Sequence, residues 1–107
     1  MSAYAIAHLR NVVPGEPIAQ YLHEIDSTLA PFGGKFRIHG GQAEVLEGDW
    51  SGDLIMIEFA DRQSARAWYA SPAYQQILPL RTGSSQGDVI FLDGVPDDHR
   101  ATDVLEA

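Results

Sequence analysis

Cysteine is absent from this chain of 107 residues. Its absence excludes disulfide bonds, thiolate catalysis and metal sites built on cysteine, and it is typical of proteins in a reducing compartment. The sequence also has no apolar run long enough to cross a bilayer, and its first residues, M-S-A-Y, lack the basic start of a secretory signal. We therefore expect a cytoplasmic protein with no membrane partner.

Basic residues are scarce, because seven lysines and arginines stand against fifteen aspartates and glutamates, for a net charge of −8. Such a chain repels a nucleic-acid backbone unless its basic side chains gather on one surface, and only Lys35 and Arg37 lie close together in a strand. No nucleic-acid partner is expected. Residues 1–95 are predicted to form one domain, and the acidic residues 96–107 a flexible tail.

The spacing of apolar residues predicts strands and helices in alternation. Strands are indicated where apolar and polar residues alternate, and helices where apolar residues recur every three or four positions. Asp61 and Ser71 suit the N-caps of two helical segments, and Pro79 is expected to end the second segment. In chain order the predicted elements are a strand at 4–9, a helix at 17–29, a strand at 35–39, an extended segment at 42–47, a strand at 54–59, helical segments at 62–70 and 71–80, and a strand at 88–92.

This βαββαβ order predicts a ferredoxin-like α+β sandwich, in which a four-stranded antiparallel sheet carries both helices on one face. The segments at 62–70 and 71–80 together stand for the second helix of this order. The face under the helices is predicted to hold Ala5, Ala7, Phe36, Ile38, Ile55, Ile57 and Phe59. The opposite face is predicted to hold Tyr4, Ile6, His8, Lys35, Arg37, His39, Leu54, Met56 and Glu58. Because Ile6, Leu54 and Met56 would leave an apolar centre in water, we predict a homodimer in which two such faces form a dimeric α/β barrel.

Several blocks of the sequence resemble one bacterial protein family. They are R-I-H-G-G, V-L-E-G-D-W, I-E-F, A-W-Y-A-S-P-A-Y and P-L-R, within residues 4–95. These blocks are similar to those of the domain of unknown function 1330 family, of the dimeric α/β-barrel superfamily. Where that family usually has a basic residue before the double glycine, this chain has His39, with Arg37 two positions earlier. The resemblance implies the fold and a dimer, and no established reaction.

The candidate catalytic residues are Glu58, His8 and His39. Glu58 interrupts an apolar strand, so it is either a buried general base of raised pKa, or the partner of Arg37 in a structural ion pair. The two histidines are candidates for acid–base chemistry, although His39 can equally end an edge strand in solvent. Their spacing fits no local metal motif, and the double glycine after His39 lacks the helix and lysine of a phosphate loop. Neither metal nor cofactor is expected.

Arg37, Tyr74, Arg81 and Trp50 are the candidate substrate-binding residues. Tyr74 and Arg81 frame the short helix, where a phenol and a guanidinium can hold a substrate carboxylate or phenolate, or can tie down a loop. Trp50 lies in a glycine-flanked loop and is either the lid of a pocket or an anchor at an interface.

Two hypotheses about function follow. The first is a homodimeric small-molecule binder or cofactor-free enzyme, with a pocket between the sheet and the short helix. Its reaction would be proton transfer, isomerisation or oxygenation of a small polar-aromatic compound, a step that rests on analogy between folds. The alternative is a structural or regulatory dimerisation module whose apolar sheet face serves only association. A cavity with convergent polar groups would favour the first.

Overall fold

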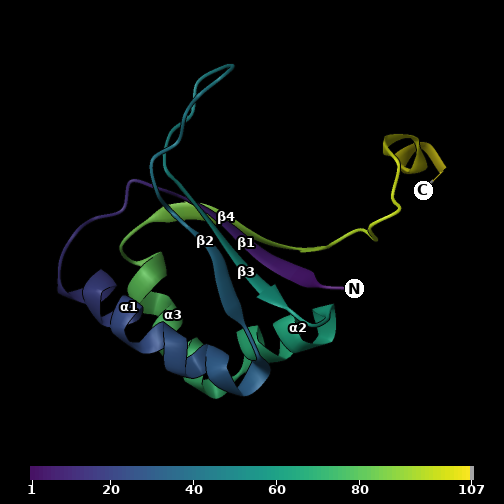
Figure 1. The fold of residues 1–107 in the computed structure, drawn as a ribbon. Coiled ribbons are helices and arrows are strands. Elements are labelled where there is room, and N and C mark those ends of the chain that lie inside the picture. Colours follow the sequence, from purple (N-terminus) through teal and green to yellow (C-terminus); the bar gives the residue numbers. More distant parts are fainter. Residues whose placement is uncertain (107) are drawn as a thin grey trace.

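Strands and helices follow one another in the order that the sequence predicts. A computed structural model describes residues 1–106 of the chain (Figure 1). The main elements are β1 (Ala3–Arg10), α1 (Glu16–Leu29), β2 (Lys35–His39), β3 (Asp53–Phe59), α2 (Arg62–Ala70), α3 (Pro72–Thr82) and β4 (Gln86–Asp93), with short 3₁₀ helices η1 (Ala30–Phe32) and η2 (Ala101–Glu106).

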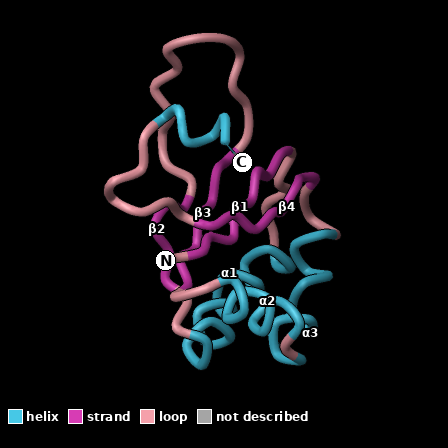
Figure 2. The backbone as a smooth tube through the Cα atoms, turned by 90° about the vertical axis from the view of Figure 1, so that its right-hand side faces the viewer, coloured by secondary structure: helices cyan, strands magenta, loops and turns pink. Residues whose placement is uncertain are grey.

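The sheet has the strand order β2-β3-β1-β4, and each neighbouring pair of strands is antiparallel. All three α-helices lie on one side of it, below the strands in Figure 2. The ferredoxin-like α+β architecture is therefore confirmed, with α2 and α3 together in the place of the second helix of the βαββαβ order. Within residues 1–106, no helix has the length and apolar character needed to cross a membrane.

The caps of α2 and α3 are those that the sequence predicts, but α3 is longer than expected. The Asp61 carboxylate accepts a hydrogen bond from the Ser64 N–H at 2.7 Å, and the Ser71 hydroxyl accepts one from the Tyr74 N–H at 3.3 Å. The prediction that Pro79 ends the helix is wrong, because α3 continues through it to Thr82. Proline removes its own N–H bond and its ring crowds the preceding turn, but its φ angle is helical and its carbonyl can still accept. The Pro79 carbonyl oxygen accepts from the Gly83 N–H at 2.9 Å, so the helical hydrogen bonds resume after Pro79.

A β-bulge in β2 changes the faces of the residues that follow it. The pairing with β3 runs Lys35 to Glu58 and Phe36 to Ile57, and then shifts by one residue. After the shift, Ile38 pairs with Met56 and His39 with Ile55. Because one extra residue reverses the alternation of side chains, the predicted faces of Ile38 and His39 are exchanged.

The face of the sheet that points away from the helices is called the outer face below. With the bulge taken into account, the pairing of the strands places Met56 beside Ile6 and Ile38, and Ile6 beside Ile90. Ile90 and Leu92 are 50% and 49% exposed. The residues of the outer face are Tyr4, Ile6, His8, Lys35, Ile38, Leu54, Met56, Glu58, Asp88, Ile90 and Leu92.

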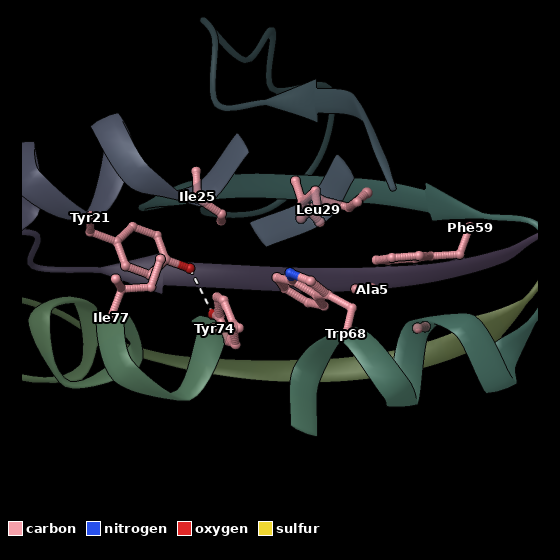
Figure 3. Close-up of a cluster of buried hydrophobic side chains, with 10 residues drawn as sticks. Ala5, Tyr21, Ile25, Leu29, Phe59, Trp68, Tyr74 and Ile77 are labelled. Carbon is pink, nitrogen blue, oxygen red and sulfur yellow. Dashed lines mark hydrogen bonds between the residues drawn. The ribbon is translucent and has the colours of Figure 1, made fainter. Parts of the chain in front are cut away.

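The core lies between the sheet and the helices (Figure 3). Trp68 is central, with its ring 4.1 Å from that of Tyr74 and 5.6 Å from that of Phe59 between centroids. The Trp68 indole N–H donates to the Thr28 hydroxyl at 3.0 Å, so the only polar atom of its side chain has a partner.

Two segments extend beyond the sheet and helices. Residues 40–52 form a long arm between β2 and β3 with no helix or strand, so the extended segment predicted at 42–47 is not part of the sheet. The tail leads away from β4 to η2, whose residues are all exposed (Figure 1). Ala107 lies outside the described residues.

Candidate functional site

A cavity of about 350 Å³ lies between the sheet and helices α1 and α3, on the face opposite the outer face. Small side chains of β1 make room for it, because Ala5 and Ala7 line the sheet wall where larger residues would fill the space. Its volume is at the lower end of the range for small-molecule sites, about 300–1,000 Å³. The apolar walls are formed mainly by Ala5, Ala7, Leu9, Val12, Ile18, Leu22, Ile25, Phe36, Ile55, Ile57, Trp68 and Val89.

Two tyrosine hydroxyls meet at this cavity. Tyr21 of α1 and Tyr74 of α3 are both buried, and their hydroxyl oxygens lie 2.7 Å apart in the hydrogen bond drawn in Figure 3. Burial raises the pKa of Tyr21, and the neighbouring Tyr74 raises it further. The Tyr21 hydroxyl therefore stays protonated at neutral pH and acts as a neutral polar group.

Arg81 lies beside the two tyrosines. It belongs to the last turn of α3, seven residues after Tyr74 and four after Ile77, so all three share one face of the helix. Arg81 is only 7% exposed, lines the cavity, and has its guanidinium carbon 5.9 Å from the centre of the Tyr21 ring. Burial alone would lower the pKa of Arg81, but the Tyr74 and Tyr21 hydroxyls outweigh it and raise that pKa.

His39 and Asp53 are the ionisable groups at the exposed side of the cavity. The bulge in β2 turns His39 to the helix face, where its ring stacks on Phe36 with centroids 4.5 Å apart. Asp53 begins β3, and both residues are exposed. The cavity therefore has a polar, open side, apolar walls and a buried cationic group. This arrangement can hold a small molecule and orient it by its polar groups.

Glu58, the carboxylate singled out from the sequence, lies on the outer face and not in the cavity. It accepts a hydrogen bond from the Arg37 Nε at 2.7 Å, and the two side chains are 25% and 50% exposed. The general-base interpretation requires a raised pKa, but the Ser2 hydroxyl lowers the pKa of Glu58, and Arg37 lowers it further. The two residues border a shallower hollow of about 190 Å³. The structure therefore favours the ion-pair interpretation.

Glu58→Gln and Arg37→Met are each expected to reduce stability only slightly at neutral pH, because an exposed pair is screened by water. Since the pKa of Glu58 is lowered in the folded state, the pair stabilises the fold above the unfolded-state pKa. That contribution disappears as the pH falls through the folded-state pKa. Urea unfolding of the single and double variants from neutral to acidic pH measures the contribution of the pair to folding stability. A large loss of stability in either single variant that is restored in the double variant would contradict the prediction of a small contribution.

His8 and Trp50 also lie away from the cavity. The His8 Nε2 is 2.7 Å from the Ser51 carbonyl oxygen, and its Nδ1 is 3.1 Å from an Arg10 guanidinium nitrogen. Trp50 stacks on the His8 ring with centroids 4.7 Å apart. These contacts hold the base of the arm against β1, which is a structural role for both residues.

The cavity thus brings together three of the residues predicted from the sequence and a fourth that the prediction did not include. His39, Tyr74 and Arg81 line it, whereas Glu58, Arg37, His8 and Trp50 do not. Tyr21 was not among the predicted site residues. The available signal was that a phenol on the apolar side of a helix needs a hydrogen-bond partner when it is buried. Residues 1–106 contain no group of three or more His, Asp or Glu side chains able to hold a metal ion.

Several solved structures share this fold. A protein of unknown function from Rhodopseudomonas palustris has a TM-score of 0.67 and 16% identity, covering 89% of this chain and 83% of that one. A dimeric ferredoxin-like protein of unknown function from Jannaschia sp. CCS1 has a TM-score of 0.68 and 16% identity, covering 88% and 100%. SnoaB, a cofactor-independent oxygenase from Streptomyces nogalater, has a TM-score of 0.53 and 15% identity, covering 92% and 98%. At such identities the similarity establishes the fold alone.

No curated protein matches the chain in sequence. A family match from residue 2 to residue 95 covers the whole sheet and all three α-helices and leaves out the tail. The chain therefore belongs to the family described as Domain of unknown function (DUF1330).

Proposed function

We propose that this protein is a homodimer that binds a small, mainly apolar molecule in the cavity between its sheet and helices α1 and α3. One observation carries the proposal: the cavity and the outer face lie on opposite sides of the sheet. A second copy that covers the outer face leaves the cavity open. Dimerisation alone therefore gives no reason for a cavity of about 350 Å³ with polar groups converging on it.

The homodimer rests on the apolar character of the outer face. Ile6, Ile38, Met56, Ile90 and Leu92 lie on neighbouring strands of it, and a contiguous apolar surface of this kind is typical of an interface. Two of the structural neighbours, from Jannaschia sp. CCS1 and Bacteroides fragilis, are described as dimeric. A pairing of outer faces about a two-fold axis would form the predicted barrel.

A cofactor-free reaction is the enzymatic form of this proposal. His39 lines the cavity and is the group in position to take a proton from a bound compound, a step shared by isomerisation and cofactor-free oxygenation. SnoaB carries out oxygenation without a cofactor on the same fold. If the ligand is turned over, His39→Gln is the variant expected to keep binding and lose turnover.

Ala7→Leu tests the binding site. Ala7 lines the sheet wall of the cavity, so the larger side chain fills space that the ligand needs. A thermal-shift screen of small aromatic and alicyclic acids, amides and alcohols should raise the melting temperature of the native protein, because a ligand stabilises the state that binds it. Ala7→Leu should abolish those shifts while keeping the melting temperature of the unliganded protein, since the added atoms enter an empty space.

Ala67→Leu is the matched control, because it makes the same change at an exposed position of α2 and should keep every shift. Ligand shifts that survive in Ala7→Leu would contradict the site. A loss of stability by Ala7→Leu of about 1–3 kcal/mol, as expected for overpacking a filled core, would contradict the cavity itself.

A further inference from the structure

Arg81 is a buried cation for which residues 1–106 provide no carboxylate partner. It takes part in none of the ion pairs of the described chain, and the four pairs present all include an exposed or half-exposed side chain. A guanidinium keeps its charge at any pH at which proteins fold, so burial cannot neutralise it. Its place in the last turn of α3, its contact with the Tyr21 ring and the Tyr21 and Tyr74 hydroxyls offset the cost of burial, but none of these is an anion. The buried guanidinium therefore lacks a counter-ion within residues 1–106 and can pair with an anionic group of a ligand.

The two tyrosines beside Arg81 add a donor with no acceptor. In the hydrogen bond between Tyr21 and Tyr74, one hydroxyl donates its hydrogen and the other accepts. The accepting hydroxyl keeps a hydrogen of its own, for which residues 1–106 provide no acceptor. The Arg81 guanidinium beside both hydroxyl oxygens can only donate hydrogen bonds to them. A guanidinium has five N–H donors and no acceptor. The buried end of the cavity therefore presents surplus donors around a positive charge.

A molecule that complements this end must bring an anionic acceptor with more than one lone pair. A carboxylate fits, because its two oxygens can accept parallel hydrogen bonds from a guanidinium and a further bond from a hydroxyl. The remaining walls are apolar, with Ile57 and Trp68 among them, so the rest of the molecule should be a hydrocarbon body. A cavity of about 350 Å³ suits a compound with a single ring.

We propose that the ligand is a small monocarboxylate with an aromatic or alicyclic ring, and that Arg81 and the free hydroxyl hydrogen of the Tyr21–Tyr74 pair bind its carboxylate. This inference rests on the proposed function and names the ligand class of the same cavity. The ring lies against the apolar walls, and the exposed side of the cavity with His39 faces the part of the ring farther from the carboxylate.

The test compares charged and neutral probes of one shape. Benzoate, phenylacetate and cyclohexanecarboxylate are titrated against the native protein beside their primary amides, with dissociation constants measured by calorimetry or ligand-observed NMR. At least one carboxylate should bind about ten- to a hundredfold more tightly than its amide, the range expected for hydrogen bonds to a charged group. Carboxylates no tighter than their amides would overturn the ligand class.

Arg81→Met identifies the residue responsible. It should bring the affinity for the carboxylate down to that for the amide, while leaving the affinity for the amide nearly unchanged. Arg66→Met, at an exposed position of α2, is the matched control and should change neither affinity. Equal losses for carboxylate and amide, or none, would overturn the role of Arg81.

The melting temperature of unliganded Arg81→Met shows whether Arg81 serves ligand binding or the stability of the fold. If Arg81 serves to bind a ligand, Arg81→Met removes a buried charge that has no counter-ion in the unliganded protein, and the melting temperature stays about the same or rises. A large fall would mean that the guanidinium holds the fold together, and the proposal would fail. Failure of the ligand class is distinct from failure of the site: amides that bind in the native protein and not in Ala7→Leu would keep the cavity as a binding site and exclude only the carboxylate.

Discussion

Met56→Asp is expected to convert the protein from a dimer into a monomer. Met56 lies on the outer face, paired with Ile6 of β1 and Ile38 of β2. In the proposed homodimer this part of the sheet is covered by the second copy, and a carboxylate there would be buried with no partner. An uncompensated buried charge costs several kcal/mol, about 3–5 in measured cases, and the two-fold axis places it in the interface twice. Each 1.4 kcal/mol weakens association about tenfold.

Light scattering coupled to gel filtration measures the effect at micromolar concentration. Val13→Asp is the control, because Val13 is an exposed apolar residue of the loop before α1 and should accept a charge without changing the assembly. A native protein that elutes as a monomer would contradict the dimer. The cavity does not depend on that outcome, since it lies within one protomer.

Trp68→Ala is expected to cost about 3–5 kcal/mol of folding stability, which is the usual range for removing a buried tryptophan. Trp68 is 2% exposed and joins the ring of Tyr74 to that of Phe59 in the core of Figure 3. The change also leaves the Thr28 hydroxyl without the indole N–H that it accepts from. Domains of this size are stable by only about 5–15 kcal/mol, so the variant should lose a large part of its stability and unfold at a much lower denaturant concentration.

Trp50→Ala provides a matched control with the same side chain. Trp50 is 46% exposed and contacts His8 at the base of the arm, so its loss should change stability far less. Chemical unfolding of the two variants followed by circular dichroism gives the comparison. Similar losses in both would contradict the assignment of the core.

The parts of the fold that depend on regular alternation could be predicted from the sequence. In β1 and β3 every residue keeps its alternation, so the two faces of both strands follow from period two alone. The bulge in β2 could not be predicted in this way. It lies between Phe36 and Ile38, and this part of the strand contains no glycine or other residue that would indicate a bulge. That single inserted residue moved His39 from the predicted outer face to the cavity.

The candidate site was found only in part for a similar reason. The spacing of Tyr74, Ile77 and Arg81 is helical, but treating Pro79 as the end of the helix separated Arg81 from that stripe. Tyr21 and Tyr74 are 53 positions apart, and their contact depends on how α1 and α3 pack. Glu58 stood out because it interrupts an apolar strand, and the structure shows that it faces Arg37 at the edge of the outer face.

A crystal structure of the protein with the tightest-binding carboxylate of the probe panel tests the central claim most directly. The account predicts the ring in the cavity between the sheet and helices α1 and α3, with the carboxylate within hydrogen-bonding distance of the Arg81 guanidinium and of a hydroxyl of Tyr21 or Tyr74. A ligand bound instead in the hollow beside Glu58 and Arg37, or between two outer faces, with the helix–sheet cavity empty, would contradict it.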